Sequence, residues 1–165
     1  MDKVDREHHN WTWREDPVEP GRSVVFDMDG VLSDAVSRQH HLKGPWRDWD
    51  AFFAACGDDP LIEETARLLE VIDPDLVVVL LTARPAWVRK QTLAWLHRYG
   101  LRWDLLAMRG PSDHGSARDF KRRSVRELRA AGFEPLLSFE DDRRNVTMFH
   151  EEGVPTVYIH SGYYD

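Results

Sequence analysis

Short apolar runs alternate with helical patterns along most of this 165-residue chain. Five apolar runs predict strands at about 22–27, 76–82, 104–108, 136–140 and 154–159. Between them, apolar residues at helical spacing predict helices at about 48–56, 61–72, 85–99, 118–131 and 143–152. Strands that alternate with helices are typical of a parallel sheet covered on both faces, so the pattern predicts an α/β fold.

Two segments lie outside this alternation. Residues 1–21 are polar and show no periodicity, so we expect an N-terminal arm that Trp11 and Trp13 pin to a domain formed by residues 22–165. Residues 33–60 form a short insert that contains one predicted helix. In that insert Trp46 and Trp49 could stack on a base or fill the core, and the pattern favours the core.

Composition narrows the class of protein. The chain is 42% apolar and 31% charged, with a formal net charge of -7. Bulk charge therefore does not favour a polyanionic partner, and a nucleic-acid role would need a local basic patch. The single Cys56 excludes an internal disulfide. No apolar run approaches the roughly 18 residues of a membrane span, so we expect no membrane partner and a cytoplasmic location.

Carboxylates follow directly after the first predicted strand. Asp27 and Asp29 are two residues apart, with Gly30 next. On an extended chain such residues point to the same side. Because like charges buried together are unfavourable unless a cation or a proton separates them, the loop indicates Mg²⁺ with a phosphate. The alternative is an Asp-Gly turn in which an Asp caps the backbone.

Two other predicted strands end in similar chemistry. Residues 136–140 are followed by Asp141 and Asp142, and residues 76–82 end at Thr82 with Arg84 close behind. Ligands of open parallel sheets bind outside the carboxyl ends of the strands, so we expect these three ends to converge. The alternatives are that the Asp pair caps the helix from 143, which is compatible with metal binding, and that Thr82 caps the helix near residue 85.

The predicted helix 118–131 presents a lysine on its apolar side. Lys121 falls with Val125 and Leu128 rather than with the charged residues. A buried lysine needs an anion, and Asp27 together with a transferring phosphate is the candidate. The alternative is a lysine that extends along the edge of the core to reach water.

The other side of this helix carries a stripe of arginines at spacings of four, four and three residues, namely Arg118, Arg122, Arg126 and Arg129. The stripe could follow a nucleic-acid backbone. It could equally be a solvated helix face that pairs with nearby acidic side chains.

The ordered series Asp27-x-Asp29-Gly30-Val31, Thr82, Lys121 and Asp141-Asp142 resembles the four motifs of the haloacid dehalogenase-like (HAD) superfamily, whose members are mostly phosphatases. The resemblance spans about residues 22–160. It implies a three-layer, Rossmann-like, parallel five-stranded sheet with the predicted strands in the order 5-4-1-2-3. The insert is too short for a full cap domain, so we expect a minimal cap or none.

The resemblance also implies roles for single residues. Asp27 would be the nucleophile and Asp29 the general acid/base, while Thr82 and Lys121 would contact the transferring phosphate. The resemblance further implies that Mg²⁺ is held by Asp27, Asp29, Asp141 and Asp142, and that substrate or phosphate is bound by Arg84, Lys43, Gly30 and Arg118.

Within the superfamily, the sequence is most similar to the 3′-phosphatase domain of phage-type polynucleotide kinase/phosphatases. The similarity is carried by residues 137–143, 146–149, 152–154 and 161–164, and by Arg84. An arginine that precedes Gly-Pro in that family is replaced here by Lys43. The kinase motif GxxxxGK[ST] does not occur in the chain.

The resemblance therefore implies a Mg²⁺-dependent phosphomonoester hydrolase that forms an aspartyl-phosphate. The expected substrates are 3′ ends of DNA or RNA in nucleic-acid repair, since an open site favours a large substrate. The alternatives are a nucleotidase or small-molecule phosphatase, and a non-catalytic module that retains the fold. The sequence predicts no particular oligomeric state.

Overall fold

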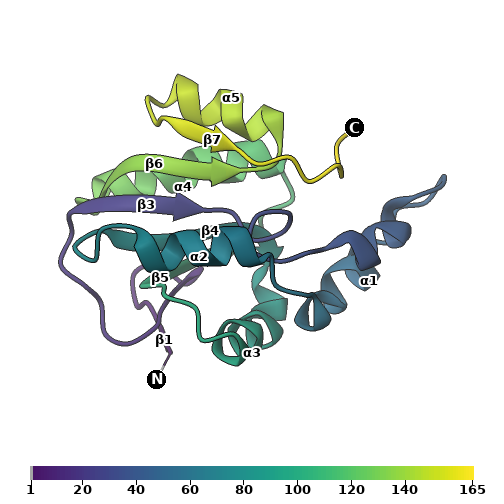
Figure 1. Cartoon of the computed structure of the whole chain (residues 1–165), viewed down its shortest axis with the longest axis horizontal. Helices are drawn as coiled ribbons and strands as arrows, with labels where there is room; N and C mark the ends of the chain where they lie inside the picture. Colours follow the sequence, from purple (N-terminus) through teal and green to yellow (C-terminus); the bar gives the residue numbers. More distant parts are fainter. Residues whose placement is uncertain (1) are drawn as a thin grey trace.

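Continuous apolar runs form strands that are buried on both faces, as in a sheet that helices cover on both sides. A computed structural model describes residues 2–165, and Figure 1 shows the sheet running through its centre. The strands are β1 (Lys3–Val4), β2 (Trp11–Trp13), β3 (Arg22–Phe26), β4 (Val77–Pro85), β5 (Leu105–Arg109), β6 (Glu134–Glu140) and β7 (Thr156–Tyr158).

The sheet is mixed and has seven strands in the order β1-β2-β5-β4-β3-β6-β7. Neighbouring strands from β5 to β7 pair in parallel, with β3 between β4 and β6. At the other edge β2 pairs antiparallel with β5, and β1 pairs antiparallel with β2. The α/β class is as predicted, but a sheet of only five parallel strands is wrong because the N-terminal hairpin extends it.

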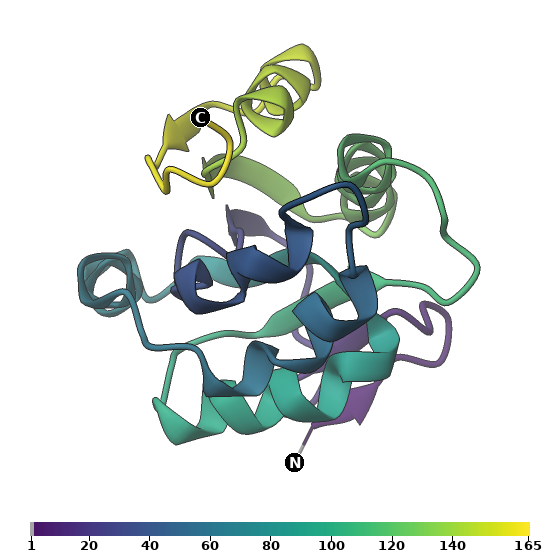
Figure 2. The ribbon, with the colours of Figure 1, turned by 90° about the vertical axis from the view of Figure 1, so that its right-hand side faces the viewer.

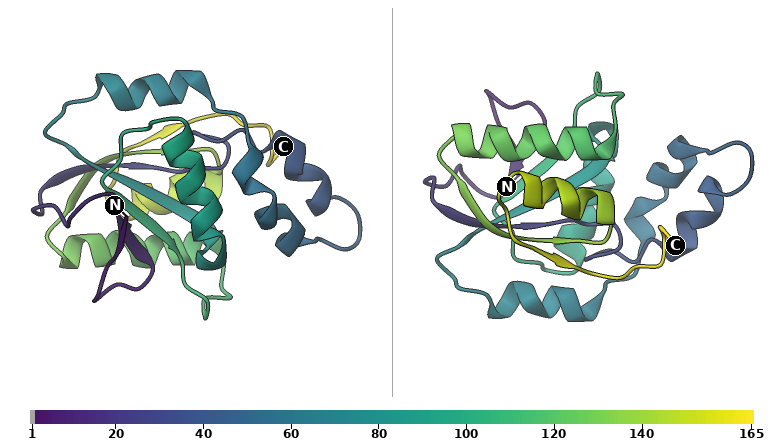
Figure 3. Two further views of the ribbon diagram at one scale, coloured as in Figure 1. Left: turned by 90° about the horizontal axis from the view of Figure 1, so that it is seen from below. Right: turned by 90° about the horizontal axis from the view of Figure 1, so that it is seen from above.

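Helices cover both faces of this sheet. Figure 3 shows α2 on one side and α4 on the other. The longer helices are α2 (Glu63–Val71), α3 (Arg89–Arg98), α4 (Ala117–Ala130) and α5 (Arg143–Glu151). Short turns of helix are η1 (Val36–Leu42), α1 (Trp49–Ala54), η2 (Cys56–Asp58) and η3 (Ala86–Val88). None of the helices described in residues 2–165 is long and apolar enough to span a bilayer.

Alternate residues of each central strand enter two separate cores. In β3, Val24 and Phe26 pack in a cluster with Trp95 of α3. Val25, which points the other way, packs in a second cluster with Leu128 of α4. These strands are therefore buried on both faces, which explains why their sequences read as uninterrupted apolar runs.

The N-terminal residues belong to the sheet rather than to a separate arm. Trp11 and Trp13 are 2% and 3% exposed, and the Trp13 indole donates a hydrogen bond of 2.7 Å to Asp5. The Trp13 ring lies 6.1 Å from that of Phe133, between centroids. These tryptophans do hold the segment to the body, as the sequence indicates. The hairpin itself escapes prediction because strands of two and three residues show no periodicity.

The insert lies beyond the carboxyl ends of the parallel strands. Its elements η1, α1 and η2 sit at the end toward which β3 points in Figure 1, next to the C-terminus. Figure 2 views the molecule from that end, with the insert in front of the sheet. The fold therefore places the insert over the edge of the sheet at which the strands end and the acidic loops begin.

We expect Trp13→Ala to lower the free energy of unfolding by about 3–5 kcal/mol, because it removes a buried ring from the second core. The control is Trp46→Ala, whose side chain is 87% exposed and should change stability by no more than about 0.5 kcal/mol. Urea denaturation of both variants checks this. Equal effects would mean that the hairpin does not contribute to the folded core.

Candidate active site

The ends of β3 and β6 bring three carboxylates together. The Asp27 N–H donates to the Phe139 carbonyl at 3.0 Å, so the two strands leave the sheet side by side. Asp27, Glu140 and Asp141 each offer an oxygen, and these atoms all lie within 4.8 Å of one another. All three residues are buried. The convergence of strand ends that the sequence predicts therefore gathers Asp27 with Asp141, and adds Glu140.

Lys121 supplies the cation that faces this cluster. Its ammonium lies 3.0 Å from an Asp27 oxygen and 2.7 Å from a Glu140 oxygen. The residue is 2% exposed, which rules out a lysine reaching to water. Periodicity placed Lys121 on the buried side of α4, and the structure supplies the anions that such a lysine needs. One ammonium against three carboxylates still leaves the cluster short of positive charge.

The charge imbalance appears in the acid–base properties of the group. Burial raises the pKa of Asp27 well above its usual value, and the neighbouring Glu140 raises it further. Burial and Glu140 likewise raise the pKa of Asp141 to about 7. Burial alone would also raise the pKa of Glu140, but the Lys121 charge outweighs it and lowers that pKa. Two of the three carboxyls are therefore hard to ionise without further positive charge.

The donor set fits a hard divalent cation. Both carboxylate oxygens of Asp141 are buried and accept no hydrogen bond of normal geometry among the described residues, although the Ser161 hydroxyl lies close enough to lower the Asp141 pKa. An unpaired buried carboxylate is costly unless a ligand completes it. Oxygen donors from carboxylates are what Mg²⁺ prefers. The Asp27–Asp141 pair could thus hold such an ion, while Glu140 is occupied by Lys121 and by the N–H groups of Asp141 and Asp142.

Gly30 brings the backbone of this loop close to the Asp141 carboxylate. Its φ of +83° is left-handed, and a Cβ there would overlap the Asp141 carboxylate. Both constraints favour glycine. The Gly30 N–H donates to the Ser33 carbonyl at 2.9 Å rather than pointing into open space. Its observed contribution is therefore close approach of the backbone.

A second charged cluster surrounds Asp29. Arg84 donates to one Asp29 oxygen from Nε and a terminal nitrogen at 3.0 and 2.6 Å, and Arg38 donates to the same oxygen at 2.8 Å. Both arginines are buried, at 0% and 1% exposure. Burial alone would raise the pKa of Asp29, but the charges of Arg84 and then Arg38 outweigh it and hold the pKa below its usual value.

Asp59 completes this second cluster. Its two oxygens accept from Arg38 at 2.8 and 2.6 Å, in the bidentate geometry that guanidinium favours, and one also accepts from Ser33 at 2.5 Å. Two buried arginines thus face two aspartates, so this cluster is balanced in charge. Because Arg38 lies in η1 and Asp59 follows η2, the cluster also ties the insert to the sheet.

Sequence reasoning missed Arg38 and Asp59. It assigned the insert's cation to Lys43, which the structure places in an exposed loop, whereas Arg38 is the insert residue that contacts Asp29. The available signal was the position of Arg38 in the segment next to the acidic loop. No local periodicity marks it, since the pairing with Asp59 spans 21 positions.

Two other predicted site residues, Thr82 and Asp142, lie outside the cluster of three carboxylates. Thr82 is buried and accepts the Arg84 N–H at 3.1 Å, and because β4 continues to Pro85 it does not cap a helix. Asp142 does cap α5, accepting the Arg144 N–H at 2.9 Å, and the Arg144 guanidinium occupies its oxygens. Asp142 therefore does not join the three clustered carboxylates.

The arginine stripe on α4 is largely paired. Arg122 donates to Glu151 at 2.5 Å and to Glu152 at 2.8 Å, and Arg126 donates to Glu152 at 2.9 Å. Arg118 lies 3.6 Å from its neighbour Asp119. Of the two interpretations of this stripe, the structure agrees with a solvated helix face that pairs with nearby acidic side chains.

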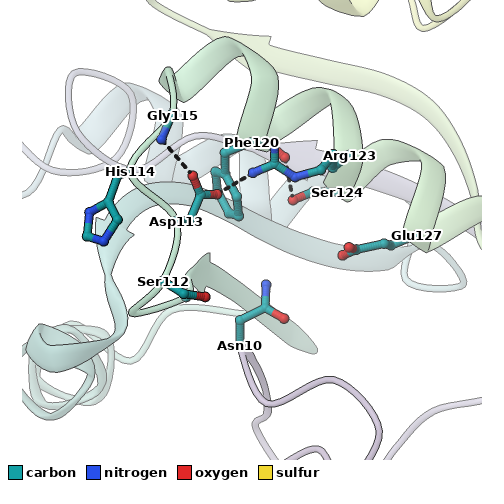
Figure 4. Close-up of a pocket in the computed structure, with 10 residues that line it drawn as sticks. Asn10, Ser112, Asp113, His114, Gly115, Phe120, Arg123, Ser124 and Glu127 are labelled. Atoms are coloured by element: carbon teal, nitrogen blue, oxygen red, sulfur yellow. Dashed lines mark hydrogen bonds and ion pairs between the residues drawn. The ribbon is translucent and has the colours of Figure 1, made fainter.

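A separate pocket of about 480 Å³ lies between the N-terminal hairpin and α4 (Figure 4). Asp113 is one of its lining residues. Its carboxylate accepts the Gly115 N–H at 3.1 Å and pairs with Arg123. Other lining residues include Asn10, Ser112, His114 and Glu127. The pocket shares no residue with either charged cluster, and two of its charged residues, Asp113 and Arg123, pair with each other.

Comparison with solved structures supports the resemblance drawn from the motifs. A chain of the Pnkp1/Rnl/Hen1 RNA repair complex superposes with a TM-score of 0.70 and 21% identity, over 90% of this chain and 45% of that one. A second structure of the Pnkp1/Rnl/Hen1 complex gives 0.70 and 22%, over 90% and 49%. A Clostridium difficile protein to which phosphatase activity is attributed gives 0.56 and 14%, over 86% of each chain.

Because the sequence identities are low, these comparisons show a shared fold only. The chain spans about half the length of the first two proteins. No protein-family model matches the chain, and no curated protein matches it in sequence. The shared fold agrees with the resemblance to HAD-like phosphatases related to polynucleotide kinase/phosphatase.

We expect the metal-free protein to lose stability as the pH rises from about 4 to about 7. The folded pKa of Asp141 is raised to about 7, whereas an unfolded aspartate titrates at roughly 3.9. Between these values the folded state keeps a proton that the unfolded chain releases, so stability falls as pH increases. Asp27 contributes with the same sign, while Asp29 and Glu140, with lowered pKa values, titrate below this window.

Thermal melting in a chelator at several pH values measures this slope. Asp141→Asn should flatten it, since the asparagine does not titrate. Adding Mg²⁺ near pH 8 should raise the melting temperature of the wild type more than that of the variant. A variant with the wild-type slope and the wild-type response to Mg²⁺ would contradict this account of the cluster.

Proposed function

We propose that this chain is a Mg²⁺-dependent phosphomonoester hydrolase of the HAD type that removes phosphate from polynucleotide 3′ ends. The observation that carries the proposal is the buried contact of Asp27 with Lys121 beside the Asp141 carboxylate, which accepts no hydrogen bond of normal geometry from the described residues. The fold shared with a chain of an RNA repair complex supports the substrate class.

Asp27 would act as the nucleophile. One of its carboxylate oxygens forms a bond to phosphorus while the bond from phosphorus to the ester oxygen breaks, which gives an aspartyl-phosphate. Water then attacks phosphorus and regenerates the carboxylate. Attack requires the ionised form, which burial and Glu140 disfavour. Bound Mg²⁺ would supply the positive charge that keeps Asp27 ionised and that balances the phosphoryl oxygens.

Asp29 would transfer the proton, first to the leaving oxygen and then from the attacking water. Its lowered pKa suits the second task better than the first, because Arg84 and Arg38 favour the carboxylate. A phosphate dianion that enters next to Arg84 would share the guanidinium charge and raise the pKa of Asp29. Substrate binding would thus prepare the acid form that protonates the leaving group.

Lys121 and Thr82 would complete the phosphate site. The Lys121 ammonium already faces Asp27 at 3.0 Å, where it can neutralise charge on the transferring group. Thr82 ends the apolar part of β4 next to this edge, and its hydroxyl could donate to a phosphoryl oxygen. Asp59 holds Arg38, so it acts through another side chain as a positioning residue.

The insert would serve as a minimal cap that leaves the site open to a large substrate. The alternative function, a nucleotidase or small-molecule phosphatase, is favoured by the net charge of -7 and by the paired arginines on α4. Both functions use the same chemistry at Asp27 and differ in what the rest of the surface contacts.

We expect phosphate release from a 3′-phosphorylated oligonucleotide in the presence of Mg²⁺, and at least a 100-fold loss in Asp27→Asn, which lacks the nucleophilic carboxylate. Release from 3′- and 5′-mononucleotides is measured beside it. Faster turnover of the mononucleotides would move the protein to the alternative function. Full activity in Asp27→Asn would refute the mechanism.

We expect Lys121→Met to abolish turnover and to destabilise the metal-free protein by about 3–5 kcal/mol, because it leaves buried carboxylates unpaired. The double variant Lys121→Met/Glu140→Gln removes one of those charges and should recover part of the stability but none of the activity. Arg67→Ala on the exposed face of α2 is the control. Activity that returns together with stability would show that Lys121 has only a structural role.

A further inference from the structure

The loop that joins η1 to α1 is the most exposed aromatic feature of the molecule. Trp46 is 87% exposed, and every residue from 43 to 50 is exposed. Trp46 makes no hydrogen bond or ring contact with any other described residue. The loop forms the tip at the right of Figure 1, beyond the carboxyl ends of the strands. The core position that the sequence favoured for Trp46 is therefore wrong.

Both ends of this loop are fixed beside the candidate active site. Arg38, before the loop, bonds to Asp29 at 2.8 Å and lies over the Phe52 ring of α1 at 4.4 Å. At its base the Asp48 N–H donates to the His41 carbonyl at 2.9 Å, and the Asp48 side chain caps α1. The exposed tryptophan is thus presented by an anchored loop, which lowers the entropy lost when a ligand binds.

The stretch from residue 35 to residue 47 carries charge opposite to the net charge of the protein. Between Asp34 and Asp48 the chain carries no carboxylate side chain, although the whole protein has a net charge of -7. The basic and imidazole side chains in this interval are Arg38, His40, His41, Lys43 and Arg47. Arg38 is buried in its cluster, so Lys43 and Arg47 remain as exposed cations on either side of Trp46. Lys43 and Arg47 are therefore the cations that this loop could offer to a polyanion, although the exposed Asp48 and Asp50 follow them directly.

We infer that residues 43–47 form a docking surface for the single-stranded end of a polynucleotide, with a base stacked on Trp46 and backbone phosphates near Lys43 and Arg47. Exposed aromatic rings interleaved with cations are the chemistry by which proteins hold single strands. A small phosphate ester would not reach this surface. The inference rests on the proposed function and assigns its preference for polynucleotides to this loop.

Binding tests the inference without turnover. In an Asp27→Asn background, a labelled single-stranded oligonucleotide with a 3′-phosphate is titrated by fluorescence anisotropy. Trp46→Ala should weaken binding by about 5- to 100-fold, the range for loss of one stacked base. Trp46→Phe should restore most of the affinity. Arg47→Ala should weaken binding and reduce its salt dependence, whereas the matched control Arg67→Ala on α2 should change neither.

Kinetics separates this inference from the proposed function. With otherwise wild-type protein, Trp46→Ala should raise KM for the oligonucleotide and leave turnover of p-nitrophenyl phosphate unchanged. If the wild type hydrolyses no phosphate ester, the proposed function fails, and the binding titration still reports on the loop. If both substrates are hydrolysed and Trp46→Ala binds the oligonucleotide as tightly as the wild type, the docking surface is refuted while the phosphatase stands. Loss of a dimer in Trp46→Ala with unchanged oligonucleotide affinity would likewise overturn it in favour of a second copy of the chain.

Discussion

Burial of Asp27, Glu140 and Asp141 against a single ammonium is the constraint on which the rest of the structure depends. Carboxylates lose hydration when buried, and opposite charge, hydrogen bonds or a bound proton must compensate for the loss. Three parts of the fold bring these carboxylates and the lysine together. Strands β3 and β6 leave the sheet side by side, α4 turns Lys121 inward, and Gly30 lets the neighbouring loop approach without a side chain.

The two charged clusters differ in a way that matters for function. Arg38 and Arg84 face Asp29 and Asp59, so the second cluster is balanced and can be stable without a ligand. The first cluster has an excess of negative charge, and it is there that the buried oxygens of Asp141 accept no hydrogen bond of normal geometry from the described residues. The balanced cluster ties the insert to the sheet and fixes Asp29, while the incomplete cluster remains for a cation and a phosphate. This contrast distinguishes the candidate centre from ordinary buried ion pairs.

Local pattern was enough to predict the helices, the parallel strands and the inward face of Lys121, because each depends on periodicity within one element. The N-terminal hairpin was missed because its strands are too short to show a period. Arg38 and Asp59 were missed for another reason, since their pairing is a tertiary contact between segments of irregular structure. Exposure of Trp46 was likewise beyond local pattern, because an aromatic residue in a short insert reads as core until the packing of η1 on α1 is known.

The proposed chemistry requires that Asp27 carry the phosphoryl group during turnover. The most direct measurement is rapid acid quenching during hydrolysis of a 3′-phosphorylated oligonucleotide, followed by mass spectrometry of the peptide that contains Asp27. The account predicts a phosphoryl adduct on Asp27 that appears only with Mg²⁺ and that is absent in Asp27→Asn. Phosphate release at the full rate with the phosphoryl group found on another residue would contradict it.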